Sequence, residues 1–308
     1  MKVSIIGGAG RVGSNAAYAL QLIGKVSEIA IVDVMQEQAE GEALDLRHGA
    51  SLAAPQKFTW GGYDQVAGSH FVVITAGLRR KPDEPRLALI NRNVALFRDI
   101  LQEVGKVPLA PDAVLIVVTN PVDILTQIAV KESGFPRERV IGTGTLLDTT
   151  RFRSFLGEYF GVAQTQVNAL ILGEHGDSMV PIWSSATING TPLTSFPGYK
   201  EDEVRAIFDR TKASGARVIA LKGGAGYSIG LVTAALVNAI ALDTKQVLPV
   251  SSYQTGLLGI EDVCLSVPTL VGRNGVEGLV PIQLWEKEKA ALLNSARVLR
   301  ETLAQVNA

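Results

Sequence analysis

The stretch "VSIIGGAGRVG", residues 3–13, places a glycine-rich turn directly after a short apolar run. Gly8, Gly10 and Gly13 have the spacing G-x-G-x-x-G, and the residues that follow are typical of a helix. Bare glycine backbone lets a pyrophosphate approach the N–H groups at the helix N-terminus, where the helix dipole favours negative charge. A tight packing turn has the same composition, so the turn needs support from its surroundings.

Asp33 gives that support. It follows Gly13 by 20 residues and lies at the end of the next apolar run, "IAIVDV" (29–34). A carboxylate at this place accepts hydrogen bonds from a ribose diol and repels a 2′-phosphate. The pattern therefore favours NAD over NADP, the alternative being a solvated acid at a strand end.

The first half of the chain alternates apolar runs with helical patterns. Each run is too continuously apolar for a sheet with one solvated face, which indicates strands covered on both faces. The predicted strands are 3–7, 29–34, 71–77 and 113–120, and the predicted helices include 13–24 and 86–104. Strands that alternate with helices predict an α/β fold, a Rossmann doubly wound parallel sheet.

The pattern of strand-like and helix-like segments changes after about residue 145. Strand patterns are mixed there with long helical patterns, which predicts an α+β domain. The expected strands are 167–172 and 256–272, and the expected helices lie near 201–221, 228–245 and 283–305. We therefore divide the chain into an NAD-binding domain, 1–145, and a substrate or catalytic domain, 146–308.

Composition excludes several classes of protein. The net charge of −1 gives no reason to expect nucleic acid or a membrane surface as partner. No apolar stretch reaches the roughly 20 residues of a membrane span, and "MKVSIIGGAG" leads directly into a strand without a signal peptide. The single cysteine, Cys264, rules out an intrachain disulfide and makes a cysteine-based metal site implausible. We expect a cytoplasmic protein without a metal.

His175 is the histidine best placed for chemistry. It follows the apolar run "VNALIL" in "GEHGDS", on an irregular turn at a strand end, whereas His48 and His70 fit a helix end and a sheet rim. Catalytic groups gather at such strand ends in α/β folds. Its ordinary pKa suits proton transfer near neutral pH. A structural histidine remains the alternative.

Asp148 and Arg151, in "GTGTLLDTTRF", are three residues apart and share a face if the segment is a helix. A buried carboxylate beside a histidine would fix its tautomer, and the arginine would offer a two-pronged donor to a substrate carboxylate. A surface ion pair between the two is the alternative. Asn120, before Pro121, would hold a substrate hydroxyl or cap a turn.

Together these motifs resemble the lactate/malate dehydrogenase family nearly from end to end. "GGAGRVG", "VTNPVD", "LDTTRF", "GEHGDS" and "KGGAGYSIG" occur in that family's order. The resemblance implies a Rossmann domain, a catalytic domain, hydride transfer between NAD and a 2-hydroxy acid, and a homo-oligomer, a tetramer or dimer.

The resemblance also implies roles for individual residues. His175 is similar to the proton donor and acceptor, Asp148 to its orienting carboxylate, and Arg86 to the arginine that polarises the ketone. Arg151 resembles the clamp on the substrate carboxylate, and Asn120 resembles a residue that contacts substrate and nicotinamide. The cofactor-binding residues implied in this way are Gly8, Ala9, Gly10, Arg11, Val12, Gly13, Asp33, Thr75, Ala76, Gly77, Asn93, Val118 and Asn120.

Arg80 decides the expected substrate. At the position that Arg80 matches in the resembled family, the lactate branch has a glutamine and the malate branch has an arginine. Closing a site over a second carboxylate without a partner would leave a buried charge, at a cost of roughly 3–5 kcal/mol. We therefore expect a malate dehydrogenase of the tricarboxylic acid cycle acting on malate and oxaloacetate, the alternative being an L-lactate or other 2-hydroxy-acid dehydrogenase.

Four positions depart from the family pattern. Asp83, Pro85 and Ala225 replace a glycine, a small hydroxyl residue and a threonine, while Glu84 is lactate-like. These departures put strict malate specificity in question. A different class of protein, a silent NAD-binding protein on this fold, predicts loss of the His/Asp/Arg set, and all of that set is present.

Overall fold

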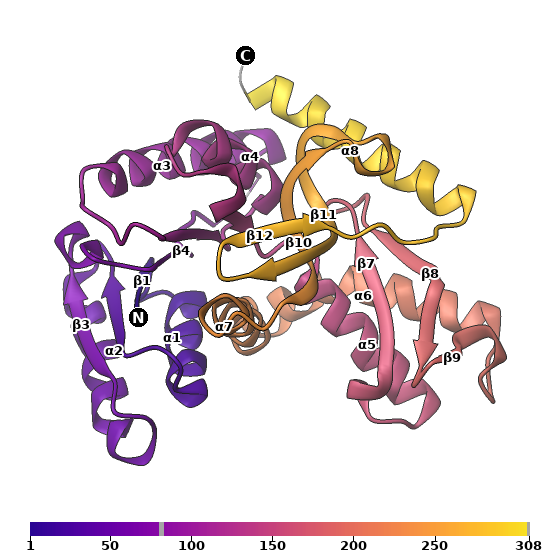
Figure 1. Ribbon diagram of the computed structural model, residues 1–308, viewed down its shortest axis with the longest axis horizontal. Coiled ribbons are helices and arrows are strands. Elements are labelled where there is room, and N and C mark those ends of the chain that lie inside the picture. The colour runs from indigo at the N-terminus through magenta and orange to yellow at the C-terminus, as the bar shows by residue number, and fades with distance from the viewer. Residues whose placement is uncertain (80–82, 307–308) are drawn as a thin grey trace.

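A computed structural model describes residues 1–79 and 83–306 of the chain, and two sheets organise it (Figure 1). The larger sheet has nine strands in the order β3-β2-β1-β4-β5-β6-β10-β11-β12. Its first six strands are parallel and have the strand order of a dinucleotide-binding fold. The predicted Rossmann sheet is confirmed.

The described residues of the first half form six strands and four α-helices. The strands are β1 (Lys2–Ile6), β2 (Glu28–Val32), β3 (Lys57–Gly61), β4 (Phe71–Ile74), β5 (Val114–Val117) and β6 (Val140–Gly142). The helices are α1 (Arg11–Ile23), α2 (Gln36–Gly49), α3 (Arg86–Gly105) and α4 (Val122–Glu132). Short 3₁₀ turns are η1 (Ala50–Leu52), η2 (Tyr63–Val66) and η3 (Arg137–Arg139).

The second half, as far as residue 306, adds six strands and four α-helices. The strands are β7 (Val167–Leu172), β8 (Val180–Ile188), β9 (Thr191–Pro192), β10 (Gln246–Thr255), β11 (Glu261–Gly272) and β12 (Gly275–Leu279). The helices are α5 (Leu146–Phe160), α6 (Glu201–Lys222), α7 (Tyr227–Ala241) and α8 (Glu286–Val306). The remaining 3₁₀ turns are η4 (Gln164–Gln166), η5 (Leu193–Ser195) and η6 (Leu257–Gly259).

Helices cover both faces of the large sheet, as the apolar strands require. Figure 1 shows α3 and α4 above it and α1, α2 and α7 below. Side chains of β1, β2, β4 and β5 that alternate along each strand are buried in two separate cores, one on each face. A third core lies between the small sheet β7-β8-β9 and helices α5 and α6.

Strands β10 to β12 cross the boundary expected at residue 145. Although they come late in the chain, they extend the first sheet in antiparallel fashion, and β10 meets β6 where Ser251 pairs with Gly142. A Cβ at Gly142 would lie 2.9 Å from the Cβ of Ser251, so this close approach depends on glycine. The two halves of the chain therefore share one continuous sheet.

Several boundaries differ from the sequence prediction. The segment 256–272 is not one strand, since β10 ends at Thr255 and β11 begins at Glu261. Helix α7 ends at Ala241 rather than 245, because Asp243 and Lys245 have positive φ angles of 53°, which a helix does not admit. Within the described residues, no helix is both long and apolar enough to cross a membrane.

Candidate active site

The glycine turn joins β1 to α1 at the carboxyl edge of the sheet. A Cβ on Gly13 would lie 2.4 Å from the carbonyl oxygen of Gly7, and one on Gly8 would lie 2.7 Å from that of Ile5. Around Gly10 the nearest such atom is 3.2 Å away, and this residue precedes α1 without a side-chain cap. Gly8 and Gly13 thus permit close packing, while the bare N-terminus of α1 fits a pyrophosphate.

The carboxylate of Asp33 is fixed beside this turn. Its Oδ2 accepts the backbone N–H of Ala9 at 3.1 Å, and its Oδ1 accepts that of Met35 at 3.1 Å. These bonds hold the acid at the end of β2, next to the helix N-terminus. A ribose diol bound between the two would meet a carboxylate already in place.

The segment after β4 packs beside the glycine turn. Thr75 donates its hydroxyl to the carbonyl oxygens of Ile6 and Gly7, both at 3.0 Å. Asn93 is buried, and its Oδ1 accepts the N–H of Leu78 at 2.8 Å while its Nδ2 donates to the carbonyl of Leu78 at 3.3 Å. Asn93 thus fastens the chain after β4, and its direct contact with the cofactor stays a prediction.

Three further predicted cofactor residues lie after β1 and β5. The Arg11 guanidinium donates to the carbonyls of Lys222 and Gly224, so it ties α1 to the end of α6. Val118 is buried at the end of β5. Asn120 is exposed after β5, precedes a cis peptide bond, and accepts the N–H of Val122 at 3.4 Å.

His175 and Asp148 form a close pair between β7 and α5. Nδ1 of His175 lies 2.5 Å from Oδ2 of Asp148, and the other carboxylate oxygen accepts a 3.0 Å hydrogen bond from Arg151. The Asp148 side chain is only 1% exposed, which removes the alternative of a surface ion pair. Among the described residues, no other group bonds to the His175 ring, so Nε2 stays open to a ligand.

The charges of this cluster shift its proton equilibria. Burial alone would lower the pKa of His175, but the negative charge of Asp148 and its hydrogen bond outweigh burial and raise that pKa above its ordinary value. Burial would likewise raise the pKa of Asp148, yet His175 and Arg151 lower it. The pair therefore holds a carboxylate beside an imidazole that is ready to carry a proton.

The turn that carries His175 is anchored on both sides. Gly173 has a φ of +86°, and its backbone pairs in both directions with Ser266 of β11, at 2.8 and 3.0 Å. The N–H of Glu174 donates to Oγ of Ser295 on α8 at 2.7 Å. Since a side chain at Gly173 would both strain the backbone and strike Ser295, glycine is required there.

Arg86 lies apart from the His175 ring. As the first residue of α3 it is exposed, and its guanidinium contacts Asp177 at 3.0 Å and Glu174 at 3.7 Å, both on the His175 turn. A cavity of about 480 Å³ opens at this place between α3, the turn and α8. Arg80, expected to select the substrate, lies outside the described residues.

Sequence reasoning missed Asp123. This buried residue of α4 accepts the backbone N–H of His175 on Oδ2 at 2.7 Å, across 52 positions of sequence. The available signal was an acid in the otherwise apolar start of a helix, "VDIL". Such an acid is buried only at a cost unless it has a partner.

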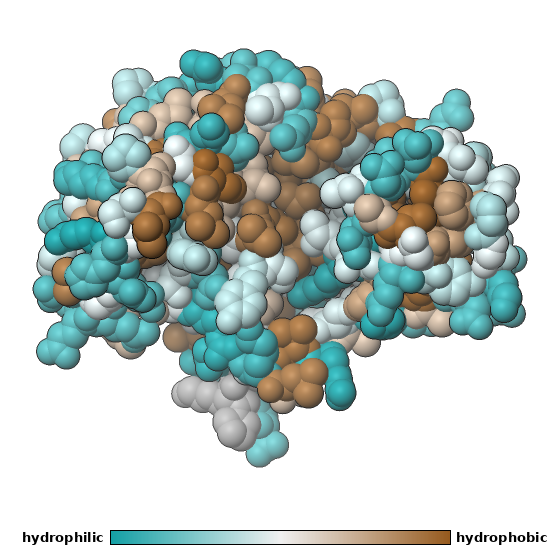
Figure 2. Space-filling view, turned by 90° about the horizontal axis from the view of Figure 1, so that it is seen from below, coloured by the Kyte–Doolittle hydropathy of each residue, from teal (hydrophilic) through white to brown (hydrophobic). Residues whose placement is uncertain are grey.

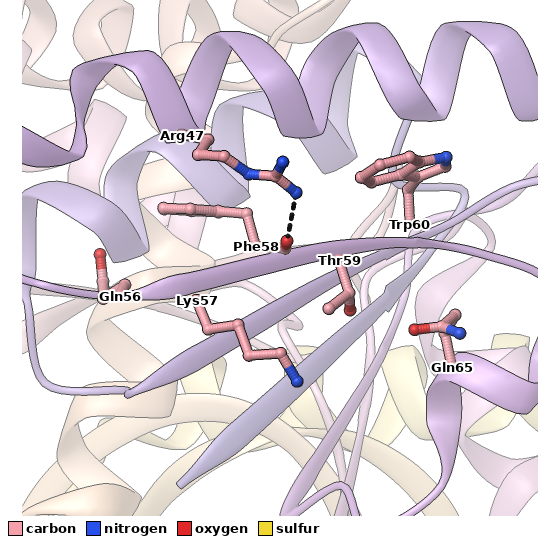
Figure 3. Close-up of a pocket in the computed structure, with 7 residues that line it drawn as sticks. All are labelled: Arg47, Gln56, Lys57, Phe58, Thr59, Trp60 and Gln65. Atoms are coloured by element: carbon pink, nitrogen blue, oxygen red, sulfur yellow. Dashed lines mark hydrogen bonds between the residues drawn. The ribbon is translucent and has the colours of Figure 1, made fainter.

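A second cavity has no part in this site. Figure 3 shows it against β3, at the far edge of the sheet, where the guanidinium of Arg47 donates to the carbonyl of Phe58 and lies 5.4 Å from the ring centre of Trp60. Among residues 1–79 and 83–306, no cluster of three acidic, histidine or cysteine side chains could hold a metal.

Known proteins match the whole chain. Residues 1–142 match the family model for the lactate/malate dehydrogenase NAD binding domain, and residues 145–308 match the model for its alpha/beta C-terminal domain. The chain belongs to the lactate/malate dehydrogenase family. NAD is accordingly its cofactor, and the glycine turn and Asp33 fit that molecule.

Relatives within this family indicate which branch is most similar. An L-lactate dehydrogenase of Clostridium acetobutylicum is 44% identical, covering 99% of this chain and 98% of the relative. An L-lactate dehydrogenase of Salinibacter ruber is also 44% identical, covering 97% and 96%. The crystal structure of a minor L-lactate dehydrogenase from Enterococcus mundtii has a TM-score of 0.95 at 38% identity, covering 99% of this chain and 98% of that one.

These findings overturn the malate prediction. The expected malate dehydrogenase, its dicarboxylate substrate and its place in the tricarboxylic acid cycle were wrong, because similar relatives over the full length are L-lactate dehydrogenases. The preference for malate over lactate depended chiefly on Arg80. Specificity in this family, as elsewhere, is a difference in affinity summed over the whole site, so one residue is a weak guide to it.

Proposed function

We propose that this chain is an NAD-dependent L-lactate dehydrogenase that interconverts L-lactate and pyruvate. The single observation that carries the chemistry is the buried Asp148 carboxylate 2.5 Å from Nδ1 of His175, with Arg151 on its other oxygen. The names of the full-length relatives support the substrate. Lactate and pyruvate are small molecules that carry one carboxylate each.

The proton moves through His175. Asp148 accepts a hydrogen bond from the Nδ1–H of His175, which fixes the tautomer and leaves Nε2 to face the substrate oxygen. In pyruvate reduction the imidazolium gives the Nε2 proton to the carbonyl oxygen, and in lactate oxidation the neutral ring takes it back. The raised pKa of His175 keeps the protonated form available near neutral pH.

Arg151 is the proposed partner of the substrate carboxylate. Its side chain is 15% exposed and donates one N–H to Asp148. Within the described part of the chain its remaining N–H groups donate to no other residue, so they are available for a two-pronged contact with a carboxylate. This contact would orient the ketone beside Nε2 of His175.

Arg86 supplies the remaining positive charge in this proposal. Negative charge develops on the carbonyl oxygen during reduction, and a guanidinium close to it stabilises that charge. To reach the oxygen, Arg86 exchanges its contacts with Asp177 and Glu174 for the substrate. Asn120, exposed at the end of β5, would hold the same substrate on the cofactor side.

NAD accepts or supplies the hydride when it is bound. The chain's part is to hold it: the bare N-terminus of α1 for the pyrophosphate, Asp33 for the ribose, and the segment that begins at Thr75 as the wall of the crevice. Because Asp33 repels a 2′-phosphate, we expect NADPH to be a poor substitute.

Steady-state kinetics test the substrate. We expect NADH oxidation with a larger kcat/KM for pyruvate than for oxaloacetate in the same assay. The control is His175→Gln, which keeps a polar side chain but cannot carry the proton, and which should abolish both rates. Absence of turnover with pyruvate, or a larger kcat/KM for oxaloacetate, would refute the proposal.

We also expect the chain to form a homo-oligomer. Figure 2 shows hydrophobic side chains gathered over the middle of one face of the molecule. Large apolar side chains that remain exposed on α1, on α7 and at the end of α6 include Tyr18, Leu22, Ile219, Leu221, Tyr227 and Leu231. Patches of this kind are commonly covered by another chain. Light scattering behind a sizing column would give the mass, and a monomer would count against this expectation.

A further inference from the structure

Asp123 contacts the turn that carries His175 and has no role in the proposed function. It is 3% exposed, on the second residue of α4, and it reaches the turn from a helix packed on the large sheet. Its Oδ2 accepts the backbone N–H of His175 at 2.7 Å. A backbone N–H buried in this way needs an acceptor, so the contact fixes the position of the His175 backbone.

The carboxylate of Asp123 also meets a polar group of the large sheet. This group is the hydroxyl of Ser251, fully buried on β10, whose hydrogen bond lowers the pKa of Asp123. A carboxylate solely for packing would be replaceable by an apolar side chain at no loss. Asp123 is instead a polar group with two polar partners, the Ser251 hydroxyl and the backbone N–H of His175, the residue proposed to carry the proton.

Charged groups around Asp123 come from several elements. Burial comes first and raises the pKa of Asp123 to about 6. The hydrogen bonds from the Ser251 hydroxyl and the His175 backbone, and the charge of His175, oppose this rise, while the charge of Glu174 adds to it. On β11, burial and the neighbouring Asp123 raise the pKa of the Cys264 thiol well above its ordinary value, which leaves that thiol neutral. The positive charge that acts on Asp123 is that of the His175 imidazolium.

Asp123 also acts on the imidazole through charge. The pKa of His175 is lowered by burial and by Arg151, and it is raised by Asp148 and by Asp123. Asp148 contacts the ring and Asp123 contacts the backbone of the same residue. Two carboxylates, from α5 and α4, thus hold His175 at two points.

We propose that Asp123 is a positioning residue: its carboxylate holds the backbone of His175 from α4, and so sets both the place and the charge of the imidazole. The proposal rests on the proposed role of His175 as proton carrier. It predicts that the hydrogen bond and the charge of Asp123 have separable effects.

Two substitutions separate these effects. Asp123→Asn keeps an oxygen that can accept the His175 N–H and removes only the charge. Asp123→Ala removes both. The matched control is Thr126→Val, one turn along the same helix, where a fully buried hydroxyl that donates to the carbonyl of Val122 is lost without any contact to His175.

Nuclear magnetic resonance of histidine labelled with ¹⁵N gives a readout that does not need turnover. The chain has 3 histidines, and His175→Gln assigns the signal. We expect the pKa of His175 to fall by about one unit in Asp123→Asn, since an opposite charge nearby has been removed. Thr126→Val should titrate like the unaltered protein. An unchanged His175 titration in Asp123→Asn would overturn the role of the charge.

Kinetics then test the position. In Asp123→Ala we expect kcat for pyruvate to fall roughly 10- to 100-fold with a smaller change in KM, because a displaced catalytic group loses rate rather than affinity. Asp123→Asn should recover most of kcat at acidic pH, where His175 is protonated. Equal losses in Asp123→Ala and Thr126→Val would overturn the positioning role.

Failure of the proposed function remains distinguishable from failure of this inference. If the unaltered protein did not reduce pyruvate, the function would be refuted, while the His175 titrations would still decide the effect of the Asp123 charge. If Asp123→Ala did not fold, Asp123→Asn would still decide it by the same measurement.

Discussion

The carboxylate of Asp148 lies 2.5 Å from Nδ1 of His175, although 27 positions separate the two residues. Helix α5 carries the acid and the turn after β7 carries the imidazole. Arg151, one helical turn after Asp148, binds the second carboxylate oxygen. One buried carboxylate therefore joins the proposed proton carrier, His175, to the proposed substrate clamp, Arg151. A substitution of either residue should alter the environment of the other.

Replacing Asp148 by Asn should cost roughly 10²–10⁴ in kcat, because an amide can donate to Nδ1 and hold the wrong tautomer. The loss of negative charge should also lower the pKa of His175. Because pyruvate reduction needs the protonated imidazole, its rate should begin to fall at a lower pH than in the unaltered enzyme. Stopped assays over a pH series measure both effects. Glu158→Gln, an exposed acid on the same helix, is the control and should leave kcat unchanged. A kcat within tenfold of the unaltered enzyme would contradict the role of Asp148.

Replacing Arg151 by Lys keeps the charge and loses the planar fork. Lysine offers a single point contact, so one hydrogen bond to the substrate carboxylate should be lost, which raises KM for pyruvate by roughly 10- to 100-fold. KM for NADH, measured in the same assays, serves as an internal control and should stay the same. An equal rise in both constants would point to general damage rather than to a carboxylate clamp.

Arg86→Gln should separate activity from stability. If Arg86 stabilises charge on the carbonyl oxygen, kcat falls by roughly 10²–10³. Its ion pair with Asp177 is exposed on both sides and contributes at most about 1 kcal/mol, so Tm should move by no more than about 4 °C. Arg98→Gln, another exposed and paired arginine of α3, is the matched variant and should retain full kcat. Similar rates for the two variants would remove Arg86 from the chemistry.

Asp33→Ser should weaken discrimination between the two nicotinamide cofactors. The substitution removes the charge that repels a 2′-phosphate and weakens the hydrogen bonds offered to a ribose diol. The ratio of kcat/KM for NADH to that for NADPH should therefore fall by on the order of tenfold or more. Asp45→Ser, an exposed acid on α2, changes the same charge away from the crevice and should leave the ratio unchanged.

Asp123 should make the protein less stable as pH rises. Its pKa is about 6 in the folded chain and 3.8 as an ordinary aspartate, so the folded state holds the proton more tightly between these values. Stability from this group is present below pH 4 and is lost through pH 6, by about 3 kcal/mol in all. The free energy of unfolding of Asp123→Asn, relative to the unaltered protein, should therefore be larger near pH 7 than near pH 4. Urea unfolding at both pH values measures this difference in the free energy of unfolding. An equal difference at pH 4 and pH 7 would exclude a raised pKa of Asp123 in the folded protein.

Local patterns in the sequence were sufficient for β1, β2, β4, β5, α1 and α3. The apolar runs at 3–7 and 71–77 became β1 and β4, and the helical pattern at 86–104 became α3. Strand and helix periodicity are read within a few residues, so these predictions need no distant contact. The late strands β10 to β12 were different, because nothing local shows that they join a sheet begun at residue 2.

The sequence by itself determined the residue types of the proposed site and the turn proposed to bind NAD, because glycine spacing and the acid at the end of β2 are local features. Only the tertiary structure decided how these residues meet. It buried Asp148 between His175 and Arg151, turned Arg86 toward Asp177, and brought Asp123 under the backbone of His175. These contacts join helices and turns that are distant in the chain, and their distances depend on packing of the whole sheet rather than on any neighbouring residue.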